Sequence, residues 1–488
     1  MIKNILSELR QQKYFLKKVG IFFLFFCIVL FSLATVSGNF YSFLSEKAYV
    51  PRVVKHAQKN LEGKIFFNDS PNTKIFTDLL VNALQSTRES IDIAVYSFNH
   101  EQISKALFRA AEQGKSVHMI LDSEKEKTFS SLYGSPSGIS VSYRGNSSSS
   151  AYMHHKFLLV DSHTESPKLF MGSFNFTDLQ ESYDPSFIAE FEDSEIISAF
   201  AEEYELLASG VSGYKKLRTE GYKPFAKRLE YENGFFEIWF GPGFKENSIK
   251  ERTLDLIKNA KKSIQIIIWR FNDRDIMHEL FQKAKAGVQI SILTDDYYLW
   301  SEDSILPELV YQIQKNKFSN VEIVSDFVNT LDLKGEIKVE NQYFNPYLHQ
   351  HTLLVDGNTV LSGTNNWTDG GFNKNDESIF ISDVPFLVEG FQKSFVTNYE
   401  AIRKSKLEYT REGNTLIFEN MPEEFLGATF AIYQEESEKS IVPDACFKSD
   451  ISSRSQTFVI PENCLGEHSL ALVFDASSHV LGGNYLSF

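Results

Sequence analysis

One sequence pattern occurs twice in the chain, as SIDIAVYSFNHEQISKALFRAAEQGKSVHMILD at Ser90–Asp122 and as SIQIIIWRFNDRDIMHELFQKAKAGVQISILTD at Ser263–Asp295. The two copies align without a gap, 173 residues apart. In each copy a continuous apolar run predicts a buried strand, and apolar residues four apart predict an amphipathic helix. A glycine then predicts the helix end before a second strand. Each copy is therefore a βαβ unit, and we expect two α/β halves with mostly parallel sheets, packed as a pseudo-twofold pair.

The rest of the chain divides around these copies. Beyond residue 404, short alternating apolar runs separated by turn residues predict a small all-β domain of the sandwich type. In chain order we expect a basic region at 1–18, an apolar segment at 19–38, a linker at 39–62, the first half at 63–230, the second half at 231–404 and the β domain at 405–488.

The apolar run VGIFFLFFCIVLFSLATV at Val19–Val36 contains no charged residue and follows Lys17 and Lys18. Its 18 residues are just enough to span a bilayer. This pattern predicts an N-terminal transmembrane helix that acts as a signal anchor, with the basic residues in the cytoplasm and the body outside it. The small residues at 36–38 leave cleavage as a signal peptide, and therefore secretion, as the alternative.

Charge and cysteine content restrict the function further. The chain of 488 residues carries a net charge of −15, and because residues 1–18 carry +4, the remainder carries −19. Such a body repels polyanions at long range, which argues against a generic nucleic-acid-binding protein and requires any anion site to be local. Cys446 and Cys464 follow the apolar run and permit one disulfide, with two free buried thiols as the alternative.

Residues that can carry chemistry come late in each half. In the first half they are His154, Lys156 and Asp161, followed by Gly172, Ser173 and Asn175. Alternation along a strand places His154 and Lys156 on one face. A lysine, an amide and a hydroxyl together suit a phosphate group, and a neutral imidazole can attack phosphorus or move a proton. No acidic or thiol partners stand at metal-ligand spacing, so neither a metal nor another cofactor is expected.

The second half repeats this pattern with changes. The corresponding residues are His349, His351 in place of lysine, Asp356, Gly363, Thr364 in place of serine, and Asn366. A histidine can donate a hydrogen bond, but near pH 7 it does not supply the full charge of a lysine. We therefore expect slower chemistry or a lower pH optimum than with two lysines.

The combined pattern, H-x-K-x4-D followed by G-S-x-N, resembles the phospholipase D superfamily, also called the HKD phosphodiesterases. The resemblance covers roughly residues 63–404. It implies that both histidines share one cleft, where one becomes a phosphohistidine and the other acts as general acid and then general base, without a metal. By position, His154 is the nucleophile and His349 the acid/base, although the reverse assignment stays open.

The resemblance also assigns the other motif residues. It implies phosphate binding by Lys156, Ser173, Asn175, His351, Thr364 and Asn366, and structural roles for Asp161, Asp356, Gly172 and Gly363. Members of the family often carry a carboxylate about 11 residues after the motif asparagine, which orients the catalytic histidine. Glu377 occupies that position in the second half and is counted as catalytic, whereas the first half has Ser186 there, near Asp184. The halves thus form either one composite site or a decayed pair that binds without turnover.

The sequence and its resemblance to this superfamily lead to three hypotheses, two enzymatic functions and one binding function. The first is a membrane-anchored, metal-independent phospholipase D that hydrolyses a phospholipid to phosphatidate and free head group, or transfers the head group. The second is an endonuclease, because the segments around His154 look closest to the nuclease and cardiolipin-hydrolase branch. The third is a surface protein that binds phosphate without catalysis. The expected partners are a phosphodiester substrate and the membrane.

Overall fold

The structure is a computed structural model. It describes residues 53–55, 59–69, 74–134, 136–243, 248–294, 304–325, 348–405, 409–421, 423–437, 440–441, 446–465, 469–474 and 480–486. The expected transmembrane helix at 19–36 lies outside these residues and stays a prediction. Within the described part of the chain, no helix combines the length and the apolar character needed to cross a bilayer.

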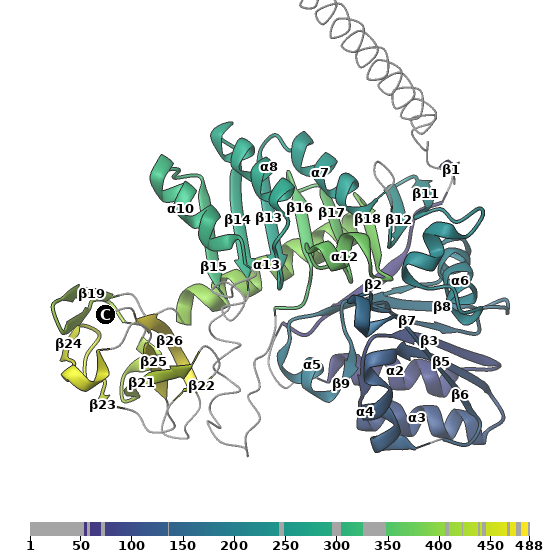
Figure 1. Ribbon diagram of the computed structural model, residues 1–488, viewed down its shortest axis with the longest axis horizontal. Helices are drawn as coiled ribbons and strands as arrows, with labels where there is room; N and C mark the ends of the chain where they lie inside the picture. The colour runs from purple at the N-terminus through teal and green to yellow at the C-terminus, as the bar shows by residue number, and fades with distance from the viewer. Residues whose placement is uncertain are drawn as a thin grey trace, which may run out of the picture. The chain divides into compact units, whose positions relative to one another are not determined.

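The first half is built on a mixed sheet of seven strands (Figure 1). Its order is β2 (Gly63–Phe67), β10 (Phe187–Phe191), β8 (Lys168–Gly172), β7 (Lys156–Val160), β3 (Ser90–Val95), β5 (Ser116–Asp122) and β6 (Ile139–Arg144). The helices of this half are α2 (Ile75–Ser86), α3 (Glu101–Glu112), α4 (Glu126–Tyr133), α5 (Asp178–Tyr183) and α6 (Ser194–Ala208). A short pair, β4 (Phe98–Asn99) and β9 (Phe176–Thr177), lies apart from the sheet.

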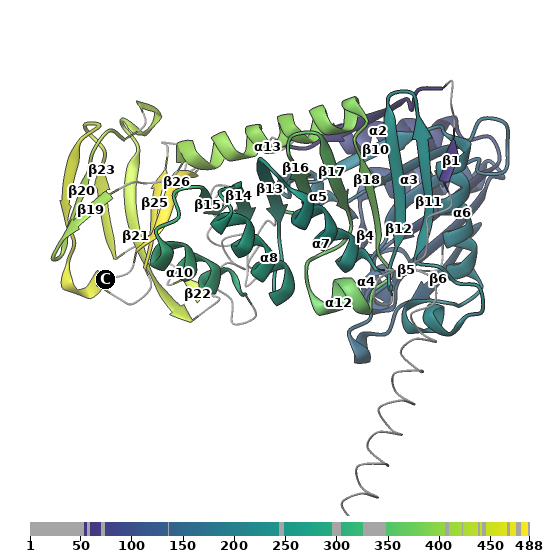
Figure 2. The same ribbon diagram turned by 90° about the horizontal axis from the view of Figure 1, so that it is seen from above.

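The second half is built on a sheet of nine strands. Its order is β1 (Val53–Lys55), β11 (Phe225–Tyr231), β12 (Gly234–Phe240), β18 (Ser378–Ser382), β17 (Thr359–Gly363), β16 (Thr352–Val355), β13 (Ser263–Ile268), β14 (Gln289–Thr294) and β15 (Val321–Ser325). Its helices are α7 (Ile249–Asn259), α8 (Arg274–Lys285), α10 (Leu306–Asn316), α12 (Asp369–Asn373) and α13 (Pro385–Ser405). Figure 2 shows the long helix α13 running across the strands of this sheet.

The predicted βαβ units are present in both halves, as β3–α3–β5 and β13–α8–β14, and the strands within each unit are parallel. The expectation of mostly parallel sheets is wrong. In each sheet the motif strand, β7 or β16, runs antiparallel to the first strand of the βαβ unit and to the strand that follows it. The physical reason is connection length, because short connections such as 161–167 and 356–358 join antiparallel strands, whereas parallel strands need a longer crossover.

Two strands lie outside their expected segments. Strand β1 falls within the stretch 39–62 that was expected to be a linker, and it pairs in parallel with β11. Strand β11 itself belongs to the second sheet, although residues 225–230 were assigned to the first half. Backbone pairing with the second sheet, and not position along the chain, therefore determines the half to which these strands belong.

One hydrophobic core joins the two halves. Alternate residues of β7 point to opposite faces of the first sheet, so that Phe157 and Leu159 enter the shared core while Leu158 and Val160 pack in a separate core of the first half. The shared core also contains Phe236 and Phe380 of the second sheet, whose rings stack 5.2 Å apart. Because the halves share buried aromatic residues, residues at their boundary are held in place from both sides.

The chain after α13 forms strands only, apart from two short 3₁₀ turns, in the part that the structure describes. One sheet contains β19 (Tyr409–Glu412), β20 (Thr415–Phe418) and β24 (Gln456–Val459). The other contains β22 (Ser440–Ile441), β21 (Thr429–Ser437), β25 (Ser469–Phe474), β26 (Val480–Leu486) and β23 (Phe447–Asp450). Cys446 and Cys464 form a disulfide, which decides between the two alternatives for these cysteines.

Candidate functional site

The first motif is fixed in place by the second half. His154 stands two residues before β7, which begins at Lys156. The backbone N–H of His154 donates to the carbonyl of Asp376 at 2.9 Å, and the N–H of Asp376 donates to the carbonyl of Tyr152 at 2.8 Å. The position of the His154 side chain therefore depends on the docking of both halves.

His154 is paired with a buried carboxylate from the other half. Its Nδ1 lies 2.9 Å from Oε2 of Glu377, which is 0 % exposed. The same carboxylate accepts hydrogen bonds from the Thr364 hydroxyl at 2.5 Å and from the Asn375 amide at 3.0 Å. With three donors around the carboxylate, Nδ1 of His154 carries the proton, and Nε2 is left with a free lone pair, as a nucleophile requires.

The second motif is in turn held by the first half, where its histidine pairs with a carbonyl instead of a carboxylate. Nδ1 of His349 lies 3.0 Å from the carbonyl oxygen of Ser173, and its backbone N–H donates to the carbonyl of Pro185 at 2.9 Å. Ser186, at the place equivalent to Glu377, donates its hydroxyl to the carbonyl of Asp184 instead. Each histidine thus has a backbone hydrogen-bond partner in the other half, Thr364 for His154 and Ser173 for His349, and His154 has the Glu377 carboxylate in addition.

An aromatic side chain stands beside each histidine. The ring of Tyr96 lies 5.1 Å from that of His154, and the ring of Trp269 lies 5.7 Å from that of His349. Tyr96 and Trp269 are 173 residues apart, so they occupy equivalent places in the repeat. Both rings are partly exposed, unlike Trp367, which is buried against Phe271. Sequence reasoning missed Tyr96, and the repeat offset was the signal that would have paired it with Trp269.

His351 stands where the family pattern has lysine. Its ring lies 4.6 Å from that of His349, and neither of its ring nitrogens has a hydrogen-bond partner among the described residues. Its backbone is left-handed, with φ of 51°. For a histidine this conformation costs on the order of 1 kcal/mol, so neighbouring contacts must hold it in place.

The hydroxyl and amide residues of the two motifs divide into two groups. The Ser173 hydroxyl accepts the N–H of Phe187 at 3.2 Å, and the Thr364 hydroxyl accepts the N–H of Ser378 at 2.9 Å. These hydroxyls, which were expected to bind phosphate, are thus engaged with the neighbouring strands. The side-chain oxygens of Asn175 and Asn366 are buried without a partner within the described chain. These oxygens can accept hydrogen bonds from a ligand, whereas a phosphoryl oxygen would have to be bound by the N–H groups of the same side chains.

The motif glycines stand where there is no room for a side chain. A Cβ at Gly172 would collide with the carbonyl of Phe187, and one at Gly363 would collide with that of Ser378. These close approaches bring the strand that follows each glycine next to the motif.

The motif aspartates lie away from the histidines and brace the start of each βαβ unit. Asp161 accepts the backbone N–H groups of Arg88, Glu89 and Ser90 at 2.7 to 3.2 Å. Asp356 accepts those of Lys261, Lys262 and Ser263 at 2.6 to 3.0 Å.

Burial dominates the electrostatics of the site. It lowers the pKa of His154 and His349 well below the usual value, and the nearby Lys156 charge lowers both further. Burial also lowers the pKa of Lys156 to about 7, against the opposing effect of Glu377 and Asp122. It raises the pKa of Glu377 to about 7, against the effect of Lys156. The Lys156 ammonium donates to the carbonyl of His154 at 2.8 Å, which places the positive charge next to His154.

A second buried charge cluster, also missed from the sequence, lies directly behind the first motif. The Lys216 ammonium binds Glu203 and, at 2.6 Å, Asp376, and His155 lies 2.8 Å from Glu203. Asp376 is the residue whose carbonyl accepts the N–H of His154. Across the described residues, no three His, Cys, Asp or Glu side chains gather as metal ligands would.

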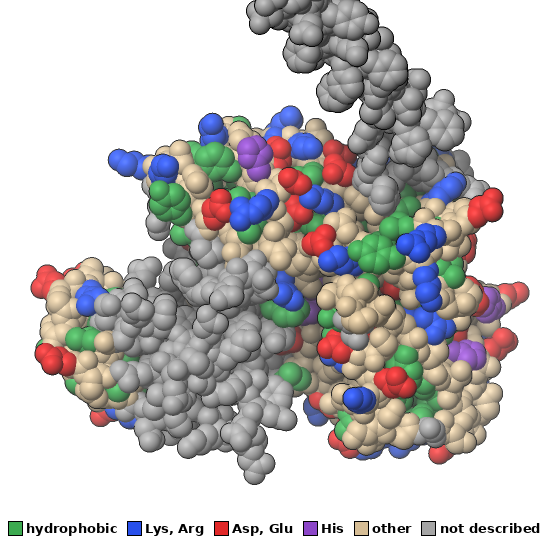
Figure 3. Space-filling view, viewed as in Figure 1, with side chains coloured by type: hydrophobic (Ala, Val, Ile, Leu, Met, Phe, Trp, Pro, Cys, Tyr) green, Lys and Arg blue, Asp and Glu red, His purple; other side chains and the backbone are tan. Residues whose placement is uncertain are grey.

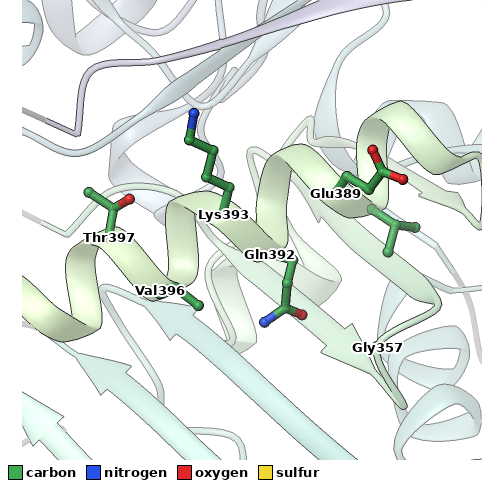
Figure 4. A pocket seen from close by; sticks show the side chains of 7 residues that line it. Gly357, Glu389, Gln392, Lys393, Val396 and Thr397 are labelled. Atoms are coloured by element: carbon green, nitrogen blue, oxygen red, sulfur yellow. The ribbon is translucent and has the colours of Figure 1, made fainter.

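A separate hollow follows one side of α13 (Figure 4). Its lining includes Gly357, Glu389, Gln392, Lys393 and Val396. It contains none of the residues that were expected to act on a substrate.

The chain is similar in sequence to known proteins. The family described as "Cardiolipin synthase, PLD-like domain" matches residues 80–207 and 253–398. Mitochondrial cardiolipin hydrolase of Danio rerio is 29% identical over 158 residues, which cover 32% of this chain and 60% of that protein. The Xenopus laevis protein of the same name is 23% identical over 154 residues, which cover 32% of this chain and 62% of that protein. The chain thus spans about 60% of the length of these curated relatives.

A solved structure shares the fold. The crystal structure of phosphatidylserine synthase from Haemophilus influenzae Rd KW20 superimposes with a TM-score of 0.53 at 12% sequence identity, covering 69% of this chain and 88% of that chain. The family match includes both halves and more than half of the residues. The chain therefore belongs to the family of PLD-like domains of the phospholipase D superfamily, and it carries two such domains in one polypeptide.

Proposed function

We propose that the protein is a phosphodiesterase of the phospholipase D type, which hydrolyses a phospholipid to phosphatidate and free head group without a metal. The observation that carries the proposal is the pair formed across the two halves by His154 and Glu377. A buried carboxylate that fixes the tautomer of a neighbouring imidazole is the arrangement of an activated nucleophile.

The first step forms a covalent intermediate. Nε2 of His154 attacks phosphorus, the bond from phosphorus to the head-group oxygen breaks, and the leaving oxygen takes a proton from Nε2 of His349, which must enter this step as imidazolium. Burial and Lys156 lower the pKa of His349 in the free protein, and the negative charge of the bound phosphodiester opposes this effect. Lys156 neutralises charge on the phosphoryl oxygens, while the side-chain N–H groups of Asn175 and Asn366 donate hydrogen bonds to the phosphoryl group from the two halves. The product of this step is a phosphohistidine on His154 and a released alcohol.

The second step returns the enzyme to its starting state. Nε2 of His349 takes a proton from water, the water oxygen attacks phosphorus, and the bond to Nε2 of His154 breaks. Nδ1 of His349 donates its proton to the Ser173 carbonyl and keeps it in both steps. Proton transfer by His349 therefore takes place at Nε2 alone. An alcohol in place of water gives head-group transfer by the same route.

The altered second motif sets the expected rate. Burial holds the pKa of His351 well below its usual value, and the nearby His349 and Lys156 lower it further. Lys156 is therefore the one lysine that the two motifs supply, and because its pKa is about 7 it is only partly charged at neutral pH. We infer slower turnover than a site with two lysines would give. The intact pair of His154 and Glu377, opposite His349, argues against a protein that only binds phosphate.

A phospholipid is the favoured substrate. The named activity of the curated relatives, hydrolysis of cardiolipin, supports it. The net charge of −15 argues against nucleic acid, and on the face seen in Figure 3 basic and acidic side chains are interspersed. The proposal includes membrane attachment through residues 19–38, with the catalytic body outside the cytoplasm. Release of the body after cleavage near Gly38 is the alternative.

Endonuclease activity is the second candidate. The partly exposed rings of Tyr96 and Trp269 favour it, because aromatic side chains beside a phosphodiester site can stack on bases. The same rings can also contact an acyl chain or a head group, so a test must include both substrate classes.

The test measures head-group release from vesicles of mixed phospholipids by the purified full chain in EDTA, with labelled single-stranded DNA in parallel. His154→Ala is expected to abolish release, and so is His349→Ala. The matched control is His118→Ala, which removes a half-exposed histidine that pairs with Asp92. Trapping with a phosphate-labelled lipid is expected to leave an acid-labile label on the protein. Loss of this label in His154→Ala identifies the phosphohistidine intermediate. Cleavage of DNA alone would move the protein to the nucleases, and silence on both substrates would contradict catalysis.

A further inference from the structure

We propose that Asp69 is a positioning residue that holds the second motif in its working conformation by binding Gln350, the residue between His349 and His351. The proposal rests on the proposed function in so far as that motif takes part in catalysis. Asp69 follows β2 in the first half, whereas Gln350 precedes β16 in the second. The contact therefore crosses between the halves at the motif itself.

Three side chains converge on one oxygen of Asp69. Oδ1 accepts from the Gln350 amide at 3.0 Å, from the Ser394 hydroxyl at 2.8 Å and from the Asn398 amide at 2.9 Å. The Gln350 amide also donates to the Ser394 hydroxyl at 2.6 Å, and Gln350 is fully buried. Lys393, on the same helix as Ser394 and Asn398, is the neighbouring cation. Such a network fixes the rotamer of Gln350 from behind the motif.

The segment that carries Asp69 is itself anchored. The amide of Asn68 donates to the carbonyls of Gln180, Glu181 and Asp184 at 2.8 to 3.0 Å, and its oxygen accepts the N–H of Ser186 at 2.6 Å. This stretch includes Pro185, whose carbonyl accepts the N–H of His349. The second motif is thus attached to one rigid part of the first half at two points, through the backbone of His349 and the side chain of Gln350.

The first half contains an equivalent anchor. His155, the middle residue of the first motif, stands 195 residues before Gln350, and its partner Glu203 on α6 stands 195 residues before Asn398 on α13. In the first half, helix α6 supplies the carboxylate of Glu203. In the second half, helix α13 supplies the amide of Asn398, and the carboxylate comes from Asp69. The recurrence at the same offset indicates that each motif needs an anchor behind its middle residue.

The conformation of His351 shows what the anchor achieves. Its left-handed backbone is unfavourable for a histidine and persists only where neighbours hold it. The Ser362 hydroxyl donates to the carbonyls of Gln350 and His351 at 3.1 and 3.3 Å, and Asp69 holds the Gln350 side chain. Loss of Asp69 removes the side-chain anchor, so that His351 can relax and His349 loses its fixed orientation.

The test reads the histidines directly in the full chain, labelled with ¹³C at histidine Cε1. The signals of His349 and His351 are assigned by their loss in His349→Gln and His351→Gln. In Asp69→Ala we expect both signals to move, while that of His118 stays. Asp69→Asn keeps an acceptor oxygen and is expected to restore them. Gln350→Met, which removes the other partner of the same hydrogen bond, is expected to repeat the effect of Asp69→Ala.

Kinetics provide the second measurement. We expect kcat of Asp69→Ala for head-group release to fall about tenfold with KM within about twofold, and Asp69→Asn to recover most of it. The matched control is Asp193→Ala, which removes a buried carboxylate that caps α6 and binds Lys59. Unchanged signals of His349 and His351 in both Asp69→Ala and Gln350→Met would overturn the proposal. Moved signals in a protein that cleaves no phosphodiester would instead overturn the proposed function alone.

Discussion

At the scale of single residues, the site is asymmetric although the fold is duplicated. His154 has a buried carboxylate as its partner, whereas His349 has a carbonyl. A carboxylate stabilises the imidazolium that forms as the histidine reacts, whereas a carbonyl fixes orientation with less charge stabilisation. This difference favours His154 as the nucleophile and His349 as the acid and base.

Replacement of Glu377 tests this division. Glu377→Gln is expected to lower kcat roughly 100-fold with little change in KM, because the amide no longer stabilises the charged form of His154. Steady-state kinetics measure the effect. The control is Glu190→Gln, which alters a buried carboxylate that binds Lys64 and Lys168. Equal losses in both variants would point to a general loss of structure.

The pH profile gives a second prediction at this scale. Catalysis needs Glu377 ionised, and it needs Lys156 and His349 protonated. The pKa of Glu377 and that of Lys156 are each about 7, and the pKa of His349 in the free protein lies well below its usual value. Activity should therefore fall below pH 7 as Glu377 gains a proton and fall above pH 7 as Lys156 loses one, with loss of the His349 proton adding to the fall on the alkaline side. We expect a narrow bell-shaped profile of kcat/KM, whose two limbs belong to the coupled pair. Glu377→Gln should remove the acid limb, and an acid limb that survives unchanged would argue against this assignment.

At the scale of elements, each motif strand ends at an aspartate that ties it to the βαβ unit. Asp161 and Asp356 both have left-handed backbones, with φ of 53° and 54°, and each accepts three successive backbone N–H groups. Aspartate suits both demands, because it tolerates this conformation and its carboxylate accepts several hydrogen bonds. The aspartates therefore connect the motif strand to the repeat without contacting the histidines.

Asp161→Ala is expected to lower the free energy of unfolding by roughly 1–3 kcal/mol, because it frees the N–H groups and places alanine in a left-handed conformation. Urea denaturation measures the loss, and kcat/KM at 25 °C should stay within about twofold of the wild type. Asp161→Asn, which tolerates the conformation and keeps one acceptor oxygen, is expected to lose less. A large fall in kcat in the fully folded variant would indicate a direct role in the site.

At the scale of the whole molecule, the net charge of −15 opposes approach to an anionic surface. The screening length falls from about 30 Å at 10 mM salt to about 10 Å at 100 mM. We expect the apparent KM for anionic vesicles to decrease severalfold over this range, with kcat unchanged. Zwitterionic vesicles, which carry no net charge, serve as the control. A KM that rises with salt would indicate a basic binding surface, as in nucleic-acid-binding proteins.

The amino-acid sequence was enough to predict the duplicated βαβ unit, the motif residues and the asymmetry between the halves. These features follow from local rules, because apolar periodicity defines strands and helices, and spacing along one chain places His154 and Lys156 together. The pairing of a carboxylate with its histidine is visible only in the folded protein, since the partner of His154 is Glu377 of the other half. The antiparallel course of the motif strands, the disulfide and the Asp69 contact with Gln350 also depended on it. Contacts between distant segments arise from the packing of whole faces, and no local pattern in the sequence records which faces meet.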